Sequence, residues 1–237
     1  MLRIRDFMLP SLAAAMTHLE LLPHILRATQ PELERHLSQT RPFFALSATL
    51  TLYAHDIEEY GDIARLFDFF LAHPASVPVY FFATVVSSRK AELLEIEEDE
   101  PEMLHSVLSK LPKPLDLELL IRQTMQLYEA HPPESLPGNP WRTIDKHSVL
   151  KTTVGINSLR SQTLQQGQTW FRKQDQKLKR DQALRDVKNT MWAYRKPAQS
   201  AGIAISIAIL AWWLRRDTNA VPLMLTALRN CRSLCGL

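Results

Sequence analysis

The pattern of apolar and polar positions along the chain predicts a protein built from α-helices. Between residues 63 and 71 the apolar side chains recur at the spacing of one helix face, at Ile63, Leu66, Phe67, Phe70 and Leu71. The dipeptide His73-Pro74 ends this helix, because a residue before proline is pushed out of the α region. Residues 79–86 are apolar at nearly every position, as in a helix buried among others. We therefore expect residues 63–86 to form a helical hairpin in the core.

The same helical spacing recurs in four further segments: residues 2–28, 31–37, 101–108 and 115–130. Pro10 and Pro23 break or bend the first of these helices. The last helix carries, along one edge, Leu119, Leu120, Gln123 and Leu127. The chain has only six glycines and few alternating runs of Val, Ile and Thr, which argues against a β-rich fold. The predicted fold class is all-α.

Beyond residue 131 the composition changes twice. Residues 132–168 have the composition of a Pro/Ser/Gln-rich linker. The four prolines from 132 to 140 indicate an extended stretch, and residues 141–168, rich in Ser, Thr and Gln with weak periodicity, indicate disorder or a loose helix. Residues 169–196 then form a basic helix, with nine Lys and Arg against three Asp and aromatic residues at both ends. Such a helix could bind nucleic acid, calmodulin or an anionic bilayer surface. The segment that follows it in the chain distinguishes among these partners.

The neighbouring stretch, residues 197–214, predicts a single transmembrane helix. It has no charged residue, and at 1.5 Å per residue it extends about 27 Å, close to a thin hydrocarbon core. The side chains that would meet lipid are Ala201, Ile203, Ile205, Ile207, Ile209, Leu210, Trp212, Trp213 and Leu214. Arg215 and Arg216 follow, as cations do at a membrane boundary. The alternative is a buried helix of a soluble protein, since the span is short.

The distribution of positive charge predicts the orientation of this helix. More Lys and Arg precede it than follow it, so the helical domain would face the cytosol and residues 215–237 would form a short tail across the membrane. The lipid bilayer is thus a predicted partner. A formal charge of +3 is too small to indicate nucleic acid by itself, and we expect none to bind.

No pattern in the chain predicts a cofactor, a metal site or a catalytic centre. Cys231 and Cys235 are the only cysteines, and no Cys/His grouping has zinc-site spacing. The acidic run in residues 92–102 lacks the alternation and the glycine of a calcium loop. His55 stands in a polar turn, where a solvated or capping role is favoured over that of a base. Neither a P-loop nor a hydrolase or metalloprotease motif occurs.

Several blocks, in order along the chain, resemble the C-terminal half of a TBC domain, the Rab GTPase-activating fold. They are Leu2-Arg-Ile-Arg-Asp-Phe-Met, Phe44-Ala-Leu-Ser, Arg65-Leu-Phe-Asp-Phe-Phe-Leu-Ala, His73-Pro74, Pro78-Val-Tyr and Met103-Leu-His-Ser-Val-Leu. The likeness is greatest to the endoplasmic-reticulum-anchored branch of that family. It implies that residues 1–131 are the C-terminal lobe of the domain, with the N-terminal half missing, and that Arg65, Asp68, Phe69 and Phe70 form a structural motif.

The resemblance also implies a function: stimulation of GTP hydrolysis by a GTP-bound Rab in traffic from the endoplasmic reticulum to the Golgi. TBC domains lend an arginine and a glutamine to the GTPase, so they regulate an enzyme rather than act as one. The motifs that carry these two residues, Ile-x-x-Asp-x-x-Arg and Tyr-x-Gln, occur nowhere in this chain. We expect the chain to be inactive alone.

Two alternatives remain open at the level of sequence. Arg65 could replace the missing arginine, but an ion pair with Asp68, three residues along the same helix, is favoured. The whole chain could instead be a membrane-anchored helical adaptor with no GTPase-activating role. The sequence does not say which Rab would be the partner.

Overall fold

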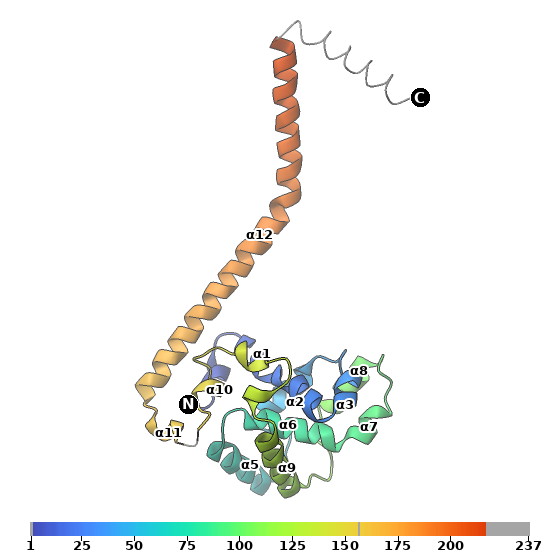
Figure 1. The fold of residues 1–237 in the computed structure, drawn as a ribbon, viewed down its shortest axis with the longest axis vertical. Helices are drawn as coiled ribbons and strands as arrows, with labels where there is room; N and C mark the ends of the chain where they lie inside the picture. The colour runs from blue at the N-terminus through green and yellow to red at the C-terminus, as the bar shows by residue number, and fades with distance from the viewer. Residues whose placement is uncertain (1, 156, 217–237) are drawn as a thin grey trace. The chain divides into compact units, whose positions relative to one another are not determined.

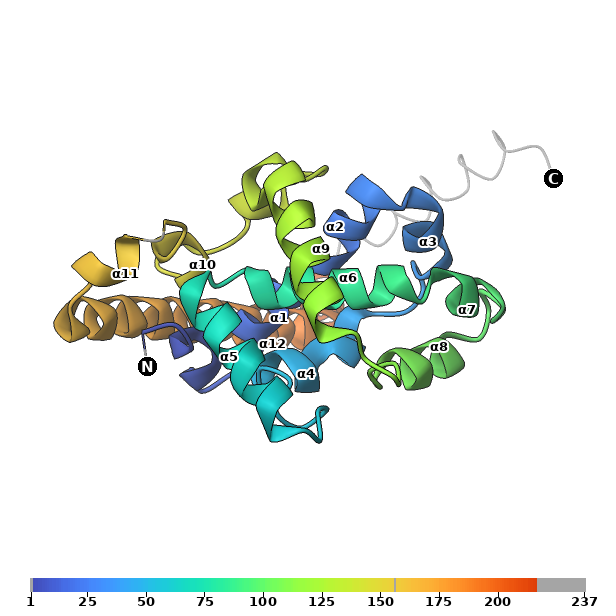
Figure 2. The same ribbon diagram turned by 90° about the horizontal axis from the view of Figure 1, so that it is seen from below.

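A computed structural model describes the backbone of residues 2–155 and 157–216. The chain divides into two compact units, Met1–Leu178 and Lys179–Leu237, which are described separately below. Every regular element in the described residues is a helix (Figures 1 and 2). The all-α prediction is confirmed.

The first unit consists of short helices joined by tight turns. Its 3₁₀ helices are η1 (Arg5–Met8), η2 (Pro42–Ala45), η3 (Pro133–Ser135) and η4 (Pro140–Arg142). Its α-helices are α1 (Ala13–Leu19), α2 (Leu21–Thr29), α3 (Pro31–His36), α4 (Leu46–Leu50), α5 (Tyr60–Ala72), α6 (Val77–Ser88), α7 (Lys90–Leu94), α8 (Pro101–Leu108), α9 (Leu117–Ala130), α10 (Val149–Thr152) and α11 (Ser158–Ser161). A last helix, α12 (Leu164–Arg216), begins in this unit and belongs to the second unit from Lys179 on.

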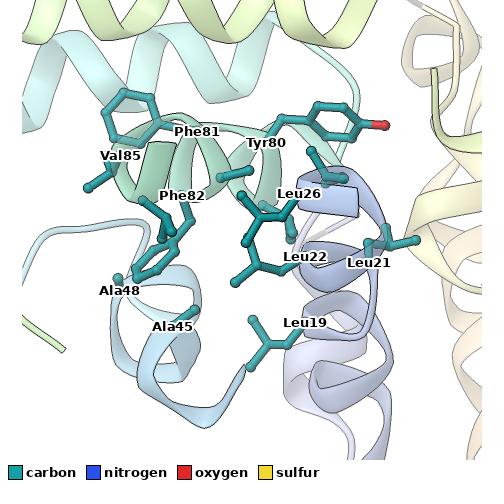
Figure 3. Close-up of a cluster of buried hydrophobic side chains, with 14 of the residues drawn as sticks. Leu19, Leu21, Leu22, Leu26, Ala45, Ala48, Tyr80, Phe81, Phe82 and Val85 are labelled. Carbon is teal, nitrogen blue, oxygen red and sulfur yellow. The ribbon is translucent and has the colours of Figure 1, made fainter. Parts of the chain in front are cut away.

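Helix α6 lies at the centre of the first unit. All ten side chains from Val77 to Val86 are buried, as the nearly all-apolar run of residues 79–86 predicts. Figure 3 shows Tyr80 of α6 near Leu26 of α2, and Phe82 of α6 near Ala48 of α4. Helix α9 packs on another side of α6. The central position of α6 is confirmed, and its main neighbours are α9 and α2.

Of the two prolines predicted to break or bend the helix of residues 2–28, only Pro10 does so. Instead of one bent helix the structure has η1, α1 and α2, and Pro10 lies in the break between the first two. Pro23 stands in the first turn of α2, where a missing N–H costs no helical hydrogen bond, so it is accommodated.

The buried face of α9 differs from the predicted edge. Leu119 and Gln123 are exposed, whereas the buried residues are Leu117, Leu120, Ile121 and Thr124. These four also follow the i, i+3, i+4, i+7 spacing. The Thr124 hydroxyl bonds to Leu120 O and to Thr84 Oγ1 of α6, which lets a polar residue occupy the buried face.

The segment predicted as a loose linker, residues 132–168, is folded in large part. Four of its apolar residues, Leu136, Ile144, Val149 and Leu150, are buried in the first unit. Pro133 and Pro140 each begin a 3₁₀ turn, a position that suits the fixed φ of proline. The disorder expected from composition is therefore not observed, because a few widely spaced apolar residues anchor the segment.

The described part of the second unit is the continuation of α12 as far as Arg216. The apolar residues Ile205, Ile207, Ile209, Leu210, Trp212 and Trp213 are exposed on this helix. The described residues include no helix that combines the length and apolar content needed for a membrane crossing. The side chains of Ala201, Ile203 and Leu214, and the whole of residues 217–237 with Cys231 and Cys235, lie outside the described part.

Candidate functional site

The densest polar cluster of the first unit surrounds Asp6, in η1. The Asp6 carboxylate lies 3.0 Å from His18 Nε2 of α1 and accepts a hydrogen bond of 2.5 Å from Ser148 Oγ. Both carboxylate oxygens lie 3.1 Å from the backbone N–H of Val149, at the start of α10. Asp6, His18 and Ser148 are all buried, with exposed fractions of 3% or less. The cluster therefore links η1, α1 and α10 without access to solvent.

The hydrogen bonds around Asp6 favour its charged form. Burial acts to raise the pKa of this carboxyl, but the hydrogen bond and charge of His18, and the bonds from Ser148 and Val149, outweigh it and lower the pKa. A carboxylate with donors on both oxygens is compensated for its burial. At neutral pH the cluster of Asp6, His18 and Ser148 thus contains a charged carboxylate that holds three helices together; it is called the clamp below.

The residue types Asp, His and Ser also occur in hydrolytic triads, but their connection here is different. A nucleophilic serine must donate to the histidine that removes its proton. Ser148 Oγ donates to Asp6 instead, and it accepts a bond of 3.2 Å from the N–H of Leu150 as the N-cap of α10. The arrangement holds elements together and provides no base for the hydroxyl.

Arg5 makes a second link between the same segments. Its guanidinium donates to His147 O at 2.7 Å and Leu2 O at 3.0 Å, and also to the Thr152 hydroxyl. The same group lies 5.1 Å from the ring centroid of Trp170, in the first turns of α12. Arg5 and Asp6 together connect η1 to the segment that follows α9.

Asp145 attaches the beginning of α12 to this segment. Its carboxylate accepts bonds from Lys177 Nζ at 2.7 Å and from the His147 N–H at 2.8 Å. Burial acts to raise the pKa of Asp145, but the bonds from Lys177 and His147 lower it overall. Asp145 thus connects α12, at Lys177, to the segment that precedes α10.

The ion pair predicted for Arg65 has a different partner. Arg65 donates to the two oxygens of Glu118 in α9, at 2.7 and 3.2 Å, rather than to Asp68. The side chain of Arg65 is 44% exposed, so this pair bridges α5 and α9 at the surface. A bidentate partner on a neighbouring helix is geometrically better for the planar guanidinium than a carboxylate on its own helix. Asp68 is exposed.

The other two residues of the predicted motif, Phe69 and Phe70, are buried side chains of the core. The ring of Phe70 lies 5.5 Å from that of Tyr53 and 5.7 Å from that of Phe81. Phe69 packs against His73, with ring centroids 4.7 Å apart. The four residues of the motif thus lie on α5, but only the two phenylalanines contribute to the interior.

The described residues contain no group of three or more His, Cys, Asp or Glu side chains placed to hold a metal ion.

The clamp of Asp6, His18 and Ser148, and the neighbouring contacts of Arg5, were not predicted from the sequence. Their one local signal is a pair of adjacent charges, Arg5 and Asp6, inside an apolar helical run. The partner Ser148 lies 142 residues away, and no local pattern connects the two.

Comparison with known proteins relates part of this helical unit to a known family. Residues 1–94 match the family described as the Rab-GTPase-TBC domain. The match covers η1 to α7, including the central helices α5 and α6 and the first half of the clamp.

Two relatives show how far the similarity extends. The chain is 36% identical over 156 residues to the GTPase-activating protein gyp10 of Schizosaccharomyces pombe, which covers 64% of this chain and 41% of the relative. It is 33% identical over 135 residues to human TBC1 domain family member 20, which covers 56% of this chain and 33% of the relative. The chain therefore spans well under half the length of these curated relatives. The predicted relation to TBC-domain proteins is confirmed.

Proposed function

We propose that this chain binds a Rab GTPase in its GTP-bound state, as part of a GTPase-activating system in traffic between the endoplasmic reticulum and the Golgi. The observation that carries the proposal is the match of residues 1–94 to the Rab-GTPase-TBC domain. The name of the yeast relative, a GTPase-activating protein, supports it. The described helices provide a scaffold for such binding, because residues 77–86 of the central helix α6 are all buried.

The chain by itself does not accelerate GTP hydrolysis in this proposal. Acceleration by a TBC domain needs an arginine that stabilises the charge of the transferring phosphoryl group and a glutamine that orients water. The sequence motifs for both are absent from the printed chain. Two nitrogens of the Arg65 guanidinium, Nε and Nη2, donate to the Glu118 carboxylate, which argues against a substitute role.

Binding and hydrolysis measurements with the full chain test this proposal. The chain would be immobilised and exposed to a panel of Rab proteins loaded with either GTP or GDP. We expect at least one Rab to bind in the GTP state only, with its hydrolysis rate unchanged by saturating chain. Dose-dependent acceleration would disprove the inactivity. If no Rab of the panel binds in either nucleotide state, the proposed Rab partner is disproved and the helical adaptor is favoured.

We also propose that residues 197–214 anchor the chain in the membrane of the endoplasmic reticulum, with the helical unit facing the cytosol. The support is the absence of charge in this stretch, the exposed apolar side chains from Ile205 to Trp213, and the basic residues before it. The lipid bilayer is then the second partner.

Extraction of cell membranes at high pH tests the anchor. The natural chain should remain with the membrane, and the double substitution Ile207→Arg with Leu210→Arg should release it, since each central arginine costs about 2.5 to 3.5 kcal/mol on insertion. The matched control, Gln182→Arg with Asn189→Arg, adds the same charge to exposed polar positions of α12. Equal behaviour of both variants would rule out the anchor.

A further inference from the structure

Arg5 is a buried cation that lacks a carboxylate partner in the described part of the chain. Only 3% of the residue is exposed, and its terminal nitrogens donate to neutral oxygens of Leu2, His147 and Thr152. Its Nε is buried and has no hydrogen-bond acceptor. Burial lowers the pKa of this guanidinium, although the charge of nearby Asp6 opposes the effect. A buried charge normally has a partner of opposite sign, because desolvation is costly.

Asp6 does not fill that role, because its oxygens are committed elsewhere. They accept from His18, Ser148 and Val149, and no ion pair joins them to Arg5. The carboxylate is neighbour to the cation without being its hydrogen-bond partner. Arg5 therefore keeps one buried N–H, at Nε, that an additional anionic acceptor would satisfy.

A cavity of about 350 Å³ adjoins Arg5. Four apolar side chains line it, from the N-terminal turn and the start of α12: Leu2, Met8, Leu164 and Phe171. Arg172 and Gln168 supply the remaining polar side chains of the wall. Met8 is 48% and Leu164 55% exposed, so the apolar wall continues to the surface.

Gly167 allows the two walls to approach each other. A Cβ at this position would lie 2.2 Å from Leu2 Cδ2, which is closer than any ordinary contact. The absent side chain therefore lets Leu2 rest directly on α12 and form one wall of the cavity. The cavity thus depends on close packing between two segments that are far apart in sequence.

We propose that this cavity binds an amphiphile with a single anionic head and one medium-length apolar chain. The head, a carboxylate or a phosphate, would lie against the positive charge of Arg5 and Arg172. The chain would cover Leu2, Met8, Leu164 and Phe171. The volume is at the lower end of the range for small-molecule sites, which favours one chain over a two-chain phospholipid. This site is independent of the proposed Rab binding.

Photo-crosslinking of the purified full chain tests the proposal. The probe is dodecanoate that carries a diazirine on its chain, and labelled peptides are identified by mass spectrometry. We expect labelling in residues 2–8 and 164–172 that excess dodecanoate abolishes and excess dodecanol does not. Competition by lysophosphatidate in a parallel arm distinguishes a phosphate head from a carboxylate. Labelling confined to residues 197–214, or equal competition by dodecanol, would overturn the proposal.

Two matched variants separate the site from general attraction to a basic helix. Arg172→Glu removes an exposed cation of the cavity wall, and Lys173→Glu makes the same charge change one residue along, outside the wall. We expect the first to weaken probe binding about tenfold or more, as the loss of a charge-assisted contact does, and the second to change it less than about twofold. Equal losses in both variants would refute a defined site. Arg5 itself is left intact, because its contacts hold residues 147–152 in place.

Discussion

Ser148 Oγ donates a hydrogen bond of 2.5 Å to Asp6 Oδ2, and this bond joins two residues that are 142 positions apart. One partner lies in the first turn of the chain, and the other precedes α10, beyond the prolines that follow α9. The segment predicted as a linker is consequently part of the folded unit. A fragment that ends at residue 131, the boundary predicted from sequence, would leave the buried Asp6 without two of its donors.

Removal of the Asp6 carboxylate should destabilise the first unit strongly. In Asp6→Ala, His18 and Ser148 lose their acceptor and the Val149 N–H is left unpaired in the interior. We expect a loss of about 3 to 5 kcal/mol in the free energy of unfolding, measured by urea denaturation. The control Asp68→Ala alters an exposed carboxylate and should stay within about 0.5 kcal/mol. Similar losses for both variants would contradict the clamp.

The same clamp should make stability depend on pH in acid. Hydrogen bonds and the charge of His18 lower the pKa of Asp6 against its burial, so the folded state binds the proton more weakly than the unfolded state. The stabilisation is complete above the unfolded pKa of about 4, and it is lost as pH falls through the lower folded pKa. The stability difference between the natural chain and Asp6→Asn should therefore shrink below about pH 4. A difference that grows in acid would contradict this sign.

Tyr53 should contribute a hydrogen bond that a surface tyrosine does not. Its hydroxyl donates to Pro78 O at 2.7 Å, and burial raises the pKa of the phenol well above its usual value, so it stays protonated. Tyr53→Phe removes only this bond, and we expect a loss of about 1 kcal/mol by thermal or urea unfolding. Tyr60, which is 82% exposed, provides the matched control Tyr60→Phe. Equal and negligible effects would show that the bond contributes nothing net.

The Arg65–Glu118 pair should contribute little, because both side chains are about half exposed. A double-mutant cycle with Arg65→Ala and Glu118→Ala should give a coupling energy below about 1 kcal/mol. Added salt should reduce that coupling further. A coupling above about 2 kcal/mol would indicate a larger structural role. If Arg65→Ala changes the rate at which a Rab hydrolyses GTP in the presence of the chain, Arg65 would be a candidate for the missing catalytic arginine.

Local patterns are sufficient for much of this fold. The spacing of Leu66 and Phe70 predicts α5, and His73-Pro74 predicts its end. The nearly all-apolar run of residues 79–86 predicts the buried α6. Each of these features depends on residues within one or two turns of a helix, where the period of 3.6 residues relates sequence directly to burial. The family resemblance rests on the same blocks, and residues 1–94 match that family.

Only the tertiary structure decided which charged side chains meet. The sequence suggests Asp68 for Arg65, but the packing of α5 beside α9 brings Glu118 into bidentate range. It also shows a composition typical of a linker in residues 132–168, yet four apolar side chains and the Asp6–Ser148 bond fold much of that segment onto the first unit. Helical periodicity reports only the neighbours within the same helix. Contacts between distant segments depend on how the helices pack, and that information is spread over the whole chain.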